Sequence, residues 1–361
     1  MAEGDILIVR ENEVISLLDG RELELMAAVR AAYEAHARGQ TSLPQSSFLT
    51  FPAERGSRII ALPAYLGGKY HSAGIKWVAS FPTNLNLGLN RASAVVILNS
   101  LQTGRATAIL EGSMISARRT AASAALAAQV LHRDRSVSQI GIIGCGVINF
   151  EIIRFLRSIY DGADSFVVFD LDAKRARQFS RRCESVFAGV EVRVVTNIRE
   201  VLAQCLLISF ATTAVEPHVL DLSCCGAGST ILHISLRDIS SEEILSADNV
   251  VDDVDHICRA RTSVQLAEEV TGNRNFIRCT LPEILIGAAP PRGNDESTCI
   301  FSPFGLGILD IAVSNLVYSR ALAEQKGDVI KSFYATSDST HRLEQSIVAS
   351  PESIVFSPRE I

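Results

Sequence analysis

The sequence of 361 residues has little charge and no excess of basic residues. There are 34 lysines and arginines against 40 aspartates and glutamates, which gives a formal net charge of −6. Nucleic-acid-binding domains need a positively charged surface, so this balance argues against DNA or RNA as a partner. Because 47% of the residues are hydrophobic and 20% are charged, we expect compact folding. At about 150 residues per domain, the length predicts two domains.

A long hydrophobic run is also missing. A membrane-spanning helix needs about 20 apolar residues, whereas the most apolar segments, 140–148 and 121–131, are short and rich in glycine or alanine. The N-terminal residues MAEGDILIVREN are acidic and lack the basic start of a secretion signal. We therefore expect a cytoplasmic protein without a membrane partner.

The cysteines lack the spacing of a metal site. None belongs to a Cys-x-x-Cys pair, so the sequence predicts neither a zinc site nor a disulfide framework, and we expect no metal. The adjacent pair 224–225 leaves a redox role as an alternative, but thiols in a chain without a secretion signal are more often small buried side chains. We expect free thiols at all eight positions, namely Cys145, Cys183, Cys205, Cys224, Cys225, Cys258, Cys279 and Cys299.

From Val137 onward, short β-branched runs alternate with amphipathic stretches. SQIGIIG, SFVVFD, VEVRVV, LLISFATT and STILHIS predict strands, and the segments between them predict helices. Helical patterns also cover 260–271 and 280–287. This alternation is typical of an α/β fold with a doubly wound parallel sheet, which we place at residues 119–305.

The first 118 residues predict a separate α+β lobe. A helical segment, RELELMAAVRAAYEAHARG, precedes extended segments punctuated by glycine, proline and asparagine, which favour an antiparallel or mixed sheet. An alanine-rich helix follows, for which we expect Ser116 as the N-cap. Residues 306–334 predict a helix that returns to this lobe, and 335–361, rich in serine, predict a flexible tail.

A glycine turn follows the first strand of the second half. Gly144 and Gly146 flank Cys145 in front of a predicted helix, which is the context of a dinucleotide-binding turn, although Asn149 occupies the third glycine position. Asp170 ends the next strand, where a carboxylate binds an adenosine ribose and disfavours a 2′-phosphate. The sequence therefore predicts a Rossmann domain that binds NAD. A glycine turn without a nucleotide is the alternative, and the basic pair 174–175 leaves NADP open.

Four segments together resemble the ornithine cyclodeaminase/μ-crystallin family of NAD(P)-dependent proteins. They are AGIKWVASFP, ISARRTAASAALAA, GCGVIN and SLRD, and the resemblance extends in order to about residue 330. Further segments, such as RIIALPAYLGG, GLNRASAVVILNS, NFEIIRFL and VVDDVDHICRA, are most similar to the branch that makes L-2,3-diaminopropionate for siderophores and peptide antibiotics.

The resemblance implies an oxidoreductase that acts on a secondary amine. Its substrate would be N-((2S)-2-amino-2-carboxyethyl)-L-glutamate, from which hydride passes to NAD⁺ and the resulting imine is hydrolysed to 2,3-diaminopropionate and 2-oxoglutarate. The resemblance also implies a homodimer, with residues 1–118 and 306–334 as the substrate-binding and dimerisation lobe.

Three charged residues are implied in catalysis and substrate binding. Asp238, at the carboxyl end of a strand, matches the family's catalytic carboxylate and would be the general base that activates water. The alternative is an ion pair with Arg237. Lys76 lies inside an apolar strand, where an unpaired ammonium is costly, so its partner is an internal carboxylate or, by the resemblance, a substrate carboxylate. Arg119, in the first turn of the alanine-rich helix, would bind a carboxylate of the substrate or a phosphate together with nearby N–H groups.

Other cations extend this predicted site. Gln45 stands where ornithine enzymes of the family carry an arginine, which argues against ornithine as substrate. Arg58 and Arg91 are candidates for the further carboxylates of a tricarboxylate, with surface ion pairs as the alternative, and a pyrophosphate is a second alternative for Arg91. We expect Arg118 to face solvent.

The remaining candidates belong to the cofactor site or lie beside it. His233, on the strand before Asp238, orients the site or is a core histidine. The predicted NAD-binding residues are Gly144, Gly146, Val147, Ile148, Asn149, Asp170, Thr212, Thr213, Ser235 and Gly305.

Two other functions stay open at this point. One is ornithine cyclodeamination or NAD(P)H-dependent reduction of a ketimine, and the other is a carrier of small molecules without catalysis. A carrier has no need of a base, so the combination of Lys76, Arg119 and Asp238 favours an enzyme.

Overall fold

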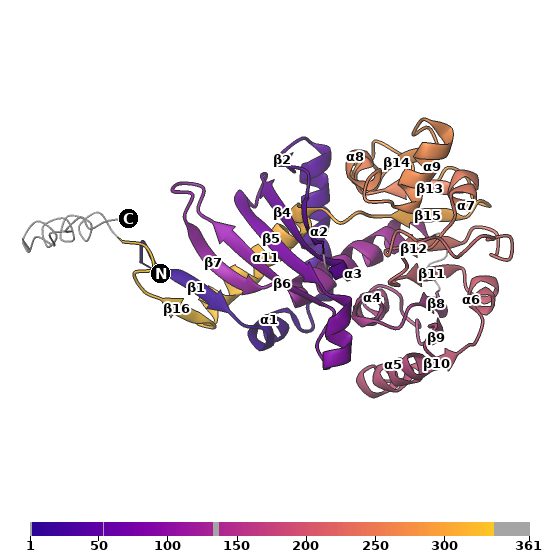
Figure 1. The fold of residues 1–361 in the computed structure, drawn as a ribbon, viewed down its shortest axis with the longest axis horizontal. Coiled ribbons are helices and arrows are strands. Elements are labelled where there is room, and N and C mark those ends of the chain that lie inside the picture. Colours follow the sequence, from indigo (N-terminus) through magenta and orange to yellow (C-terminus); the bar gives the residue numbers. More distant parts are fainter. Residues whose placement is uncertain (1, 53, 133–136, 336–361) are drawn as a thin grey trace, which may run out of the picture.

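The computed structural model describes residues 2–52, 54–132 and 137–335, which form two halves, each built on one sheet (Figure 1). The first sheet is mixed, in the order β16-β1-β7-β6-β5-β4-β2, with β3 beside β4. Alternate side chains of a strand point to opposite faces, so in β5 Lys76 is buried while its neighbour Trp77 is 44% exposed. The strands are β1 (Ile6–Val9), β2 (Thr41–Ser42), β3 (Ser47–Phe51), β4 (Glu54–Leu66), β5 (Ser72–Ser80), β6 (Ala92–Asn99), β7 (Ala106–Glu111) and β16 (Asp328–Ile330).

Four helices pack with this sheet. They are α1 (Glu11–Leu18), α2 (Glu22–Ala37), α3 (Ser113–Leu131) and α11 (Gly307–Ala323), and a short 3₁₀ helix, η1 (Pro82–Leu87), joins β5 to β6. α11 contacts α2, α3 and the strands β4 and β5, so the chain returns to its first half after the second sheet is complete. β16 then pairs antiparallel with β1 at the sheet edge.

The second sheet is parallel in every pairing, which confirms the predicted doubly wound α/β fold with a second lobe. Its order is β10-β9-β8-β11-β12-β15-β13-β14, so the direction of winding reverses between β8 and β11. Ligands of such sheets bind beside the carboxyl ends of the strands at this reversal. The strands are β8 (Gln139–Ile143), β9 (Ser165–Phe169), β10 (Glu191–Val194), β11 (Leu207–Phe210), β12 (Thr230–His233), β13 (Asp248–Val251), β14 (Ile277–Thr280) and β15 (Cys299–Ser302).

The helices of this half are shorter than the sequence predicts at two places. The helix predicted for 260–271 is α9 (Ser263–Thr271), because Ala260 and Arg261 have positive φ angles of 55° and 56° and Thr262 caps the helix. The helix predicted for 280–287 is α10 (Leu281–Leu285), and β14 before it was not predicted. The other helices are α4 (Val147–Arg157), α5 (Ala173–Val186), α6 (Ile198–Gln204), α7 (Ser241–Ser246) and α8 (Val254–Ile257).

The alanine-rich helix α3 begins three residues before the expected cap, so the prediction of Ser116 as N-cap is wrong. The N-cap is Gly112, and the carboxylate of Glu111 accepts hydrogen bonds from the backbone N–H groups of Ser113 (2.6 Å) and Met114 (3.2 Å). A carboxylate satisfies the free N–H groups and the positive end of a helix better than a hydroxyl. The hydroxyl of Ser116 is therefore available for another partner.

All eight cysteines are free, as predicted, and only Cys224 and Cys225 are partly exposed. Within the described ranges, no helix has both the length and the apolar character needed to cross a bilayer. The predicted flexible tail, 335–361, lies outside the described residues except for its first position.

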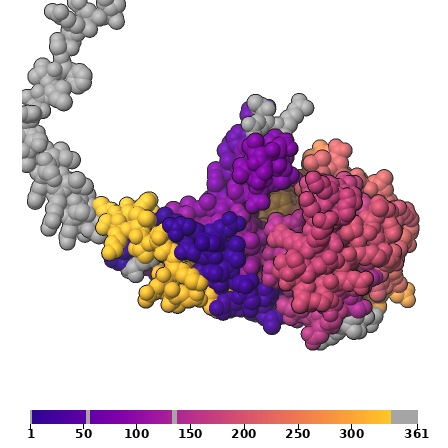
Figure 2. Space-filling model, turned by 90° about the horizontal axis from the view of Figure 1, so that it is seen from below, coloured from indigo at the N-terminus to yellow at the C-terminus, as the bar shows by residue number. Residues whose placement is uncertain are grey.

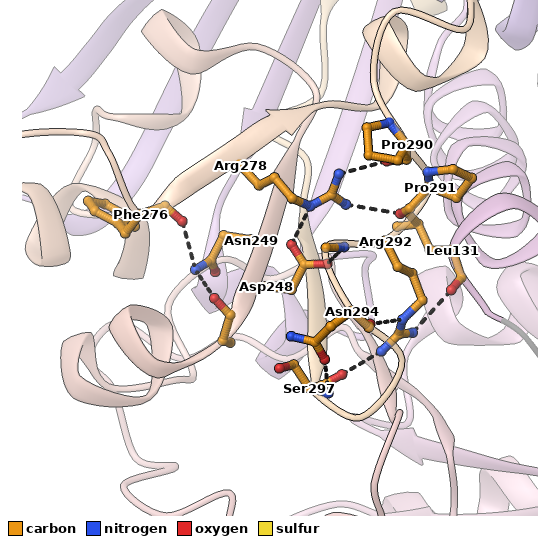
Figure 3. A network of polar contacts seen from close by, with 12 residues as sticks. Leu131, Asp248, Asn249, Phe276, Arg278, Pro290, Pro291, Arg292, Asn294 and Ser297 are labelled. Carbon is orange, nitrogen blue, oxygen red and sulfur yellow. Dashed lines mark hydrogen bonds and ion pairs between the residues drawn. The ribbon is translucent and has the colours of Figure 1, made fainter.

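Two arginines hold the long connection between α10 and β15 (Figure 3). Arg278 binds Asp248 at 2.6 Å and donates to the carbonyl groups of Pro290 and Pro291. Arg292 donates to the carbonyl groups of Ser297 and of Leu131, the last residue of α3 (Figure 3). This network joins the end of α3 to the second sheet.

We predict that Arg292→Ala lowers the free energy of unfolding by about 3 kcal/mol. The substitution leaves several carbonyl groups without a donor, and each such loss costs about 1–3 kcal/mol when the group is buried. Denaturant unfolding measures the change. The exposed helical arginine in Arg177→Ala is the control. Equal stability of the two variants would contradict a structural role for the network.

Candidate active site

A cleft of about 490 Å³ opens at the reversal point of the second sheet. It is lined by the end of β8 and its turn (143–146), the end of β9 (169–172) and the loop after β11 (211–216), with Arg175 and His218. These are the carboxyl ends of neighbouring parallel strands, so the fold itself places the predicted glycine turn, Asp170, Thr212 and Thr213 around one space.

The glycine turn is shaped for close approach of a ligand. Gly144 has a φ of +92°, and a Cβ there would lie 2.4 Å from the carbonyl oxygen of Ala211, so only glycine fits. A Cβ at Gly146 would meet no atom within 4 Å, which leaves open space in front of the first turn of α4. Gly146 and Val147 are exposed, so backbone N–H groups of this helix start face solvent.

Asn149, at the third glycine position, lies beneath the turn and not in the cleft. Its side chain is fully buried and donates to the carbonyl oxygens of Ile143 (2.9 Å) and Gly144 (2.7 Å). Ser209 donates to the Asn149 carbonyl oxygen at 2.7 Å. Asn149 therefore fixes the glycine turn to β11, while Ile148 beside it is half-buried.

Asp170 closes the other side of the cleft. One carboxylate oxygen accepts the backbone N–H of Cys145 at 2.8 Å and the other that of Asp172 at 2.9 Å. Asp170 thus stands at the glycine turn, as its position after β9 predicts. Arg175 also lines the cleft, so one cation and the carboxylates of 170 and 172 face the same space.

Asp238 is fully buried next to the cleft and does not open directly into it. The hydroxyls of Thr212 and Ser235 donate to its two carboxylate oxygens. Burial alone would raise the pKa of Asp238, but His233 and these hydroxyls outweigh it and hold the pKa below its usual value. Asp238 is therefore ionised at neutral pH, and the expected alternative of an ion pair with Arg237 is not found among the described residues, since Arg237 donates to the Ala260 carbonyl instead.

Two histidines flank this carboxylate. His233 is fully buried, and its Nε2 lies 3.2 Å from the backbone N and 3.3 Å from Oδ2 of Asp238, so it is a core histidine that contacts Asp238. His218 was not predicted. It lines the cleft, is 39% exposed, and its Nε2 lies 4.0 Å from Oδ1 of Asp238. No local pattern in AVEPHVL indicates this position, which depends on the loop packing against Asp238.

Lys76 and Arg119 share one buried carboxylate, Asp310 of α11. The Lys76 Nζ lies 2.8 Å from Oδ2 and the Arg119 Nε lies 3.0 Å from Oδ1, and Lys76 also donates to the hydroxyl of Ser116 at 3.1 Å. The internal partner left open by the sequence is therefore Asp310, a residue that sequence reasoning missed. A single acid inside the apolar helix GILDIAVSNLV was the available signal.

With two cations and one carboxylate, the cluster of Lys76, Arg119 and Asp310 has a net charge of +1. Burial, followed by the charge of Arg119, lowers the pKa of Lys76 to about 8, although Asp310 opposes the shift. Lys76 is 3% exposed and the Arg119 side chain 10%, so Arg119 is the more accessible of the two. An excess cation at low dielectric attracts the carboxylate of a ligand.

Gly305 packs directly on the Arg119 guanidinium. It has a φ of +91°, and a Cβ there would lie 2.7 Å from Nη1 of Arg119. Its N–H donates to the buried carboxylate of Asp252 at 2.7 Å, and burial raises the pKa of Asp252 to about 6. Gly305 thus positions Arg119 in this structure and does not line the cleft, and Asp252 is a second acid that the sequence did not indicate.

The other predicted cations lie apart from this cluster. In the first sheet, Arg58 of β4 pairs in register with Ser80 of β5, and Ser80 pairs with Ala92 of β6. Arg91 directly precedes Ala92, so both arginines lie at the same end of the sheet. Both are half-buried. Gln45 is exposed and forms no hydrogen bond within the described part of the chain, so the structure does not join it to the other candidates.

The prediction that Arg118 faces solvent is wrong. It is 2% exposed, and its guanidinium lies 3.4 Å from Glu151 of α4 and 3.7 Å from Asp19. The tight packing of α3 against α4 buries this side of the alanine-rich helix, and the charge is compensated by a carboxylate from the neighbouring helix. Across the described residues, no group of three or more potential metal-binding side chains is found.

The sequence matches the ornithine cyclodeaminase/mu-crystallin family model over residues 7–325. N-((2S)-2-amino-2-carboxyethyl)-L-glutamate dehydrogenase of Staphylococcus aureus (strain NCTC 8325 / PS 47) is 28% identical over 309 residues, which cover 84% of this chain and 91% of that protein.

Two solved structures are similar over nearly their whole length. Thermococcus litoralis Delta(1)-pyrroline-2-carboxylate reductase, in complex with NADH and L-proline, has a TM-score of 0.83 at 25% identity, covering 90% of this chain and 99% of that one. An archaeal alanine dehydrogenase dimer with bound NAD has a TM-score of 0.81 at 30% identity, covering 91% and 99%.

We predict that the stability of the wild type rises with pH relative to Lys76→Met. Between a folded-state pKa of about 8 and the ordinary value of 10.5, the unfolded chain holds the proton that the folded chain has lost, so raising the pH favours folding. The difference between the two proteins should change by on the order of 2 kcal/mol from pH 8 to pH 10. Denaturant unfolding at both pH values measures it, and a constant difference would contradict a lowered pKa.

Proposed function

The chain belongs to the ornithine cyclodeaminase/mu-crystallin family, and we propose that it is an NAD-dependent oxidoreductase acting on N-((2S)-2-amino-2-carboxyethyl)-L-glutamate. The family resemblance inferred from the sequence is confirmed by this match. The products are L-2,3-diaminopropionate and 2-oxoglutarate. The observation that carries the proposal is the combination of a nucleotide-sized cleft with buried or half-buried cations that have too few carboxylate partners.

The residues of the cleft fit NAD. The open space at Gly146 and the exposed start of α4 accommodate a pyrophosphate, and Asp170 supplies the acceptor for ribose hydroxyls. A carboxylate at this position repels a 2′-phosphate, which favours NAD over NADP. Thr212 and Thr213 line the same cleft, whereas Asn149 and Ser235 support it through the turn and through Asp238.

The reaction removes the hydrogen on the glutamate α-carbon as hydride, and NAD⁺, when bound, accepts it. The nitrogen must first be neutral, because its lone pair forms the C=N bond as hydride leaves. Water then adds to the imine carbon and the C–N bond breaks, which releases the two products. The balance is one conjugate, one NAD⁺ and one water giving 2,3-diaminopropionate, 2-oxoglutarate, NADH and one proton.

Asp238 is the proposed proton acceptor for these steps. Its carboxylate is ionised at neutral pH and is reached from the cleft through the hydroxyl of Thr212, which donates to it. A proton taken from the amine or from water passes to this carboxylate through the hydroxyl. His218, exposed to the cleft near Asp238, is a second group that can carry the proton.

Cations from the first half bind the substrate carboxylates in this proposal. Arg119 and Lys76 hold the α-carboxylate next to the reacting carbon, with Asp310 fixing both side chains. Arg58 and Arg91 bind a further carboxylate. Gln45, where ornithine enzymes carry arginine, lies outside these contacts.

A second copy of the chain completes the proposed assembly. The outer face of the first sheet carries exposed apolar side chains, among them the cross-strand pair Trp77 (44% exposed) and Val95 (38%), and Leu49 (48%) in the neighbouring row. An exposed apolar face of this kind is typical of a protein interface. We therefore retain a homodimer formed by the first half. The cytoplasmic location and a role in siderophore or peptide antibiotic biosynthesis stay predictions.

We predict that the protein forms NADH from NAD⁺ and the conjugate. Absorbance at the NADH band is followed together with 2,3-diaminopropionate and 2-oxoglutarate by mass spectrometry, with NADP⁺ and ornithine as parallel arms. The expected result is equal amounts of the three products and a slower reaction with NADP⁺. No NADH from the conjugate would overturn the proposal, and proline from ornithine would replace it by cyclodeamination.

Asp238→Asn is the matched variant for this assay. It has nearly the same shape and keeps one of the two acceptor oxygens that Thr212 and Ser235 use, but it removes the charge. Turnover should therefore fall at least 100-fold, the lower range of general-base effects (about 10²–10⁴-fold), with NAD binding nearly unchanged. Glu242→Gln, on the exposed first turn of α7, is the control for loss of a carboxylate. Wild-type turnover by Asp238→Asn would place the base elsewhere.

A further inference from the structure

A third arginine faces the pair Arg58 and Arg91 from the other half of the molecule. Arg237 follows β12 of the second sheet, while Arg58 lies in β4 and Arg91 just before β6 of the first. The positive charge of Arg58, after burial, lowers the pKa of both Arg91 and Arg237. Arg58 therefore lies close enough to repel Arg91 of its own half and Arg237 of the other half.

Within the part of the chain that the structure describes, none of the three has a carboxylate partner. All are half-buried, and no carboxylate of the described residues lies within 4 Å of their nitrogens. The Nε of Arg58 is buried and forms no hydrogen bond. Half-buried like charges without counter-charges oppose folding, so an arrangement that brings three together is expected where an anion binds.

The backbone around Arg237 holds its guanidinium in place. Its Nε and Nη2 both donate to the carbonyl oxygen of Ala260, at 3.2 and 2.6 Å. Leu236, the residue before it, has a φ of +69° and Ala260 a φ of +55°, both in the left-handed region that is costly for residues with a side chain. Strained backbone on both sides of one contact is typical of a functional site, and it leaves Nη1 of Arg237 without a described partner.

The space between the halves is visible from outside. In Figure 2 a purple projection, formed by the end of the first sheet around residues 80–100, rises beside the pink surface of the second half, with a recess between them. Arg58 lies in β4 opposite Ser80 and Arg91 lies just before β6, at this end of the first sheet. A ligand in the recess therefore lies beside this end of the first sheet.

We propose that Arg237, with Arg58 and Arg91, binds the carboxylate at the far end of a dicarboxylic amino-acid substrate and so selects that class. Arginine suits this role because its planar fork binds a carboxylate with two parallel hydrogen bonds. The inference rests on the proposed function for the reacting end of the substrate, where Arg119 and Lys76 lie. Arg237 acts on specificity and takes no part in the proton transfers.

We expect Arg237→Met to lose binding of dicarboxylates selectively. With NAD⁺ present, glutarate and butyrate are titrated calorimetrically into wild type, Arg237→Met, Arg237→Lys and Arg181→Met, an exposed arginine of α5 as control. Glutarate should bind at least tenfold more weakly to Arg237→Met and intermediately to Arg237→Lys, with butyrate unchanged. The Michaelis constant for the conjugate should rise more than tenfold while kcat changes less.

Equal binding of glutarate by Arg237→Met and wild type would overturn the inference, as would equal weakening of glutarate and butyrate. Arg91→Met, on the other half, should show the same selective loss, so the test does not depend on the folding of one variant. Calorimetry needs no turnover, so a protein that makes no NADH from the conjugate still passes or fails this test independently.

Discussion

The buried carboxylate of Asp310 is the constraint on which the first half and its site depend. It compensates two cations from different elements, Lys76 of β5 and Arg119 of α3, and it reaches them from α11, which returns after the whole second sheet. Removing one partner of such a group leaves a buried charge uncompensated, which costs about 3–5 kcal/mol. The route of the chain through the second half and back is therefore tied to the chemistry of the site.

The second half of the molecule contributes the cleft and a buried carboxylate beside it. Its parallel sheet reverses direction between β8 and β11, and this places the glycine turn, Asp170 and Thr212 around one cleft. Asp238 stands behind Thr212 as an ionised, fully buried carboxylate. The second half thus supplies a negative charge at Asp238, and the first half supplies positive charges at Lys76 and Arg119. This arrangement suits a substrate whose nitrogen loses a proton while its carboxylates are bound. The overall charge of −6 does not attract an anion, so local cations must do so.

Local sequence patterns predicted those features of the fold that depend on residues close together in the chain. The strand periodicity, the turn at Gly144 and the acid after β9 follow from short segments, and the structure confirms the resulting fold class. Partnerships across the chain could not be predicted. Arg118 and Arg119 are adjacent in one helix, but packing against α4 gives the first Glu151 as partner and α11 gives the second Asp310. The same limit hid His218, whose place near Asp238 comes from loop packing.

The central claim is that the glutamate α-carbon of the conjugate donates the hydride. Conjugate deuterated at that carbon, incubated with the enzyme and NAD⁺, tests this most directly when the NADH and 2-oxoglutarate are analysed by mass spectrometry. The account predicts one deuterium in each NADH formed and none in the 2-oxoglutarate. NADH without deuterium, or deuterium retained in the amino-acid product, would contradict it.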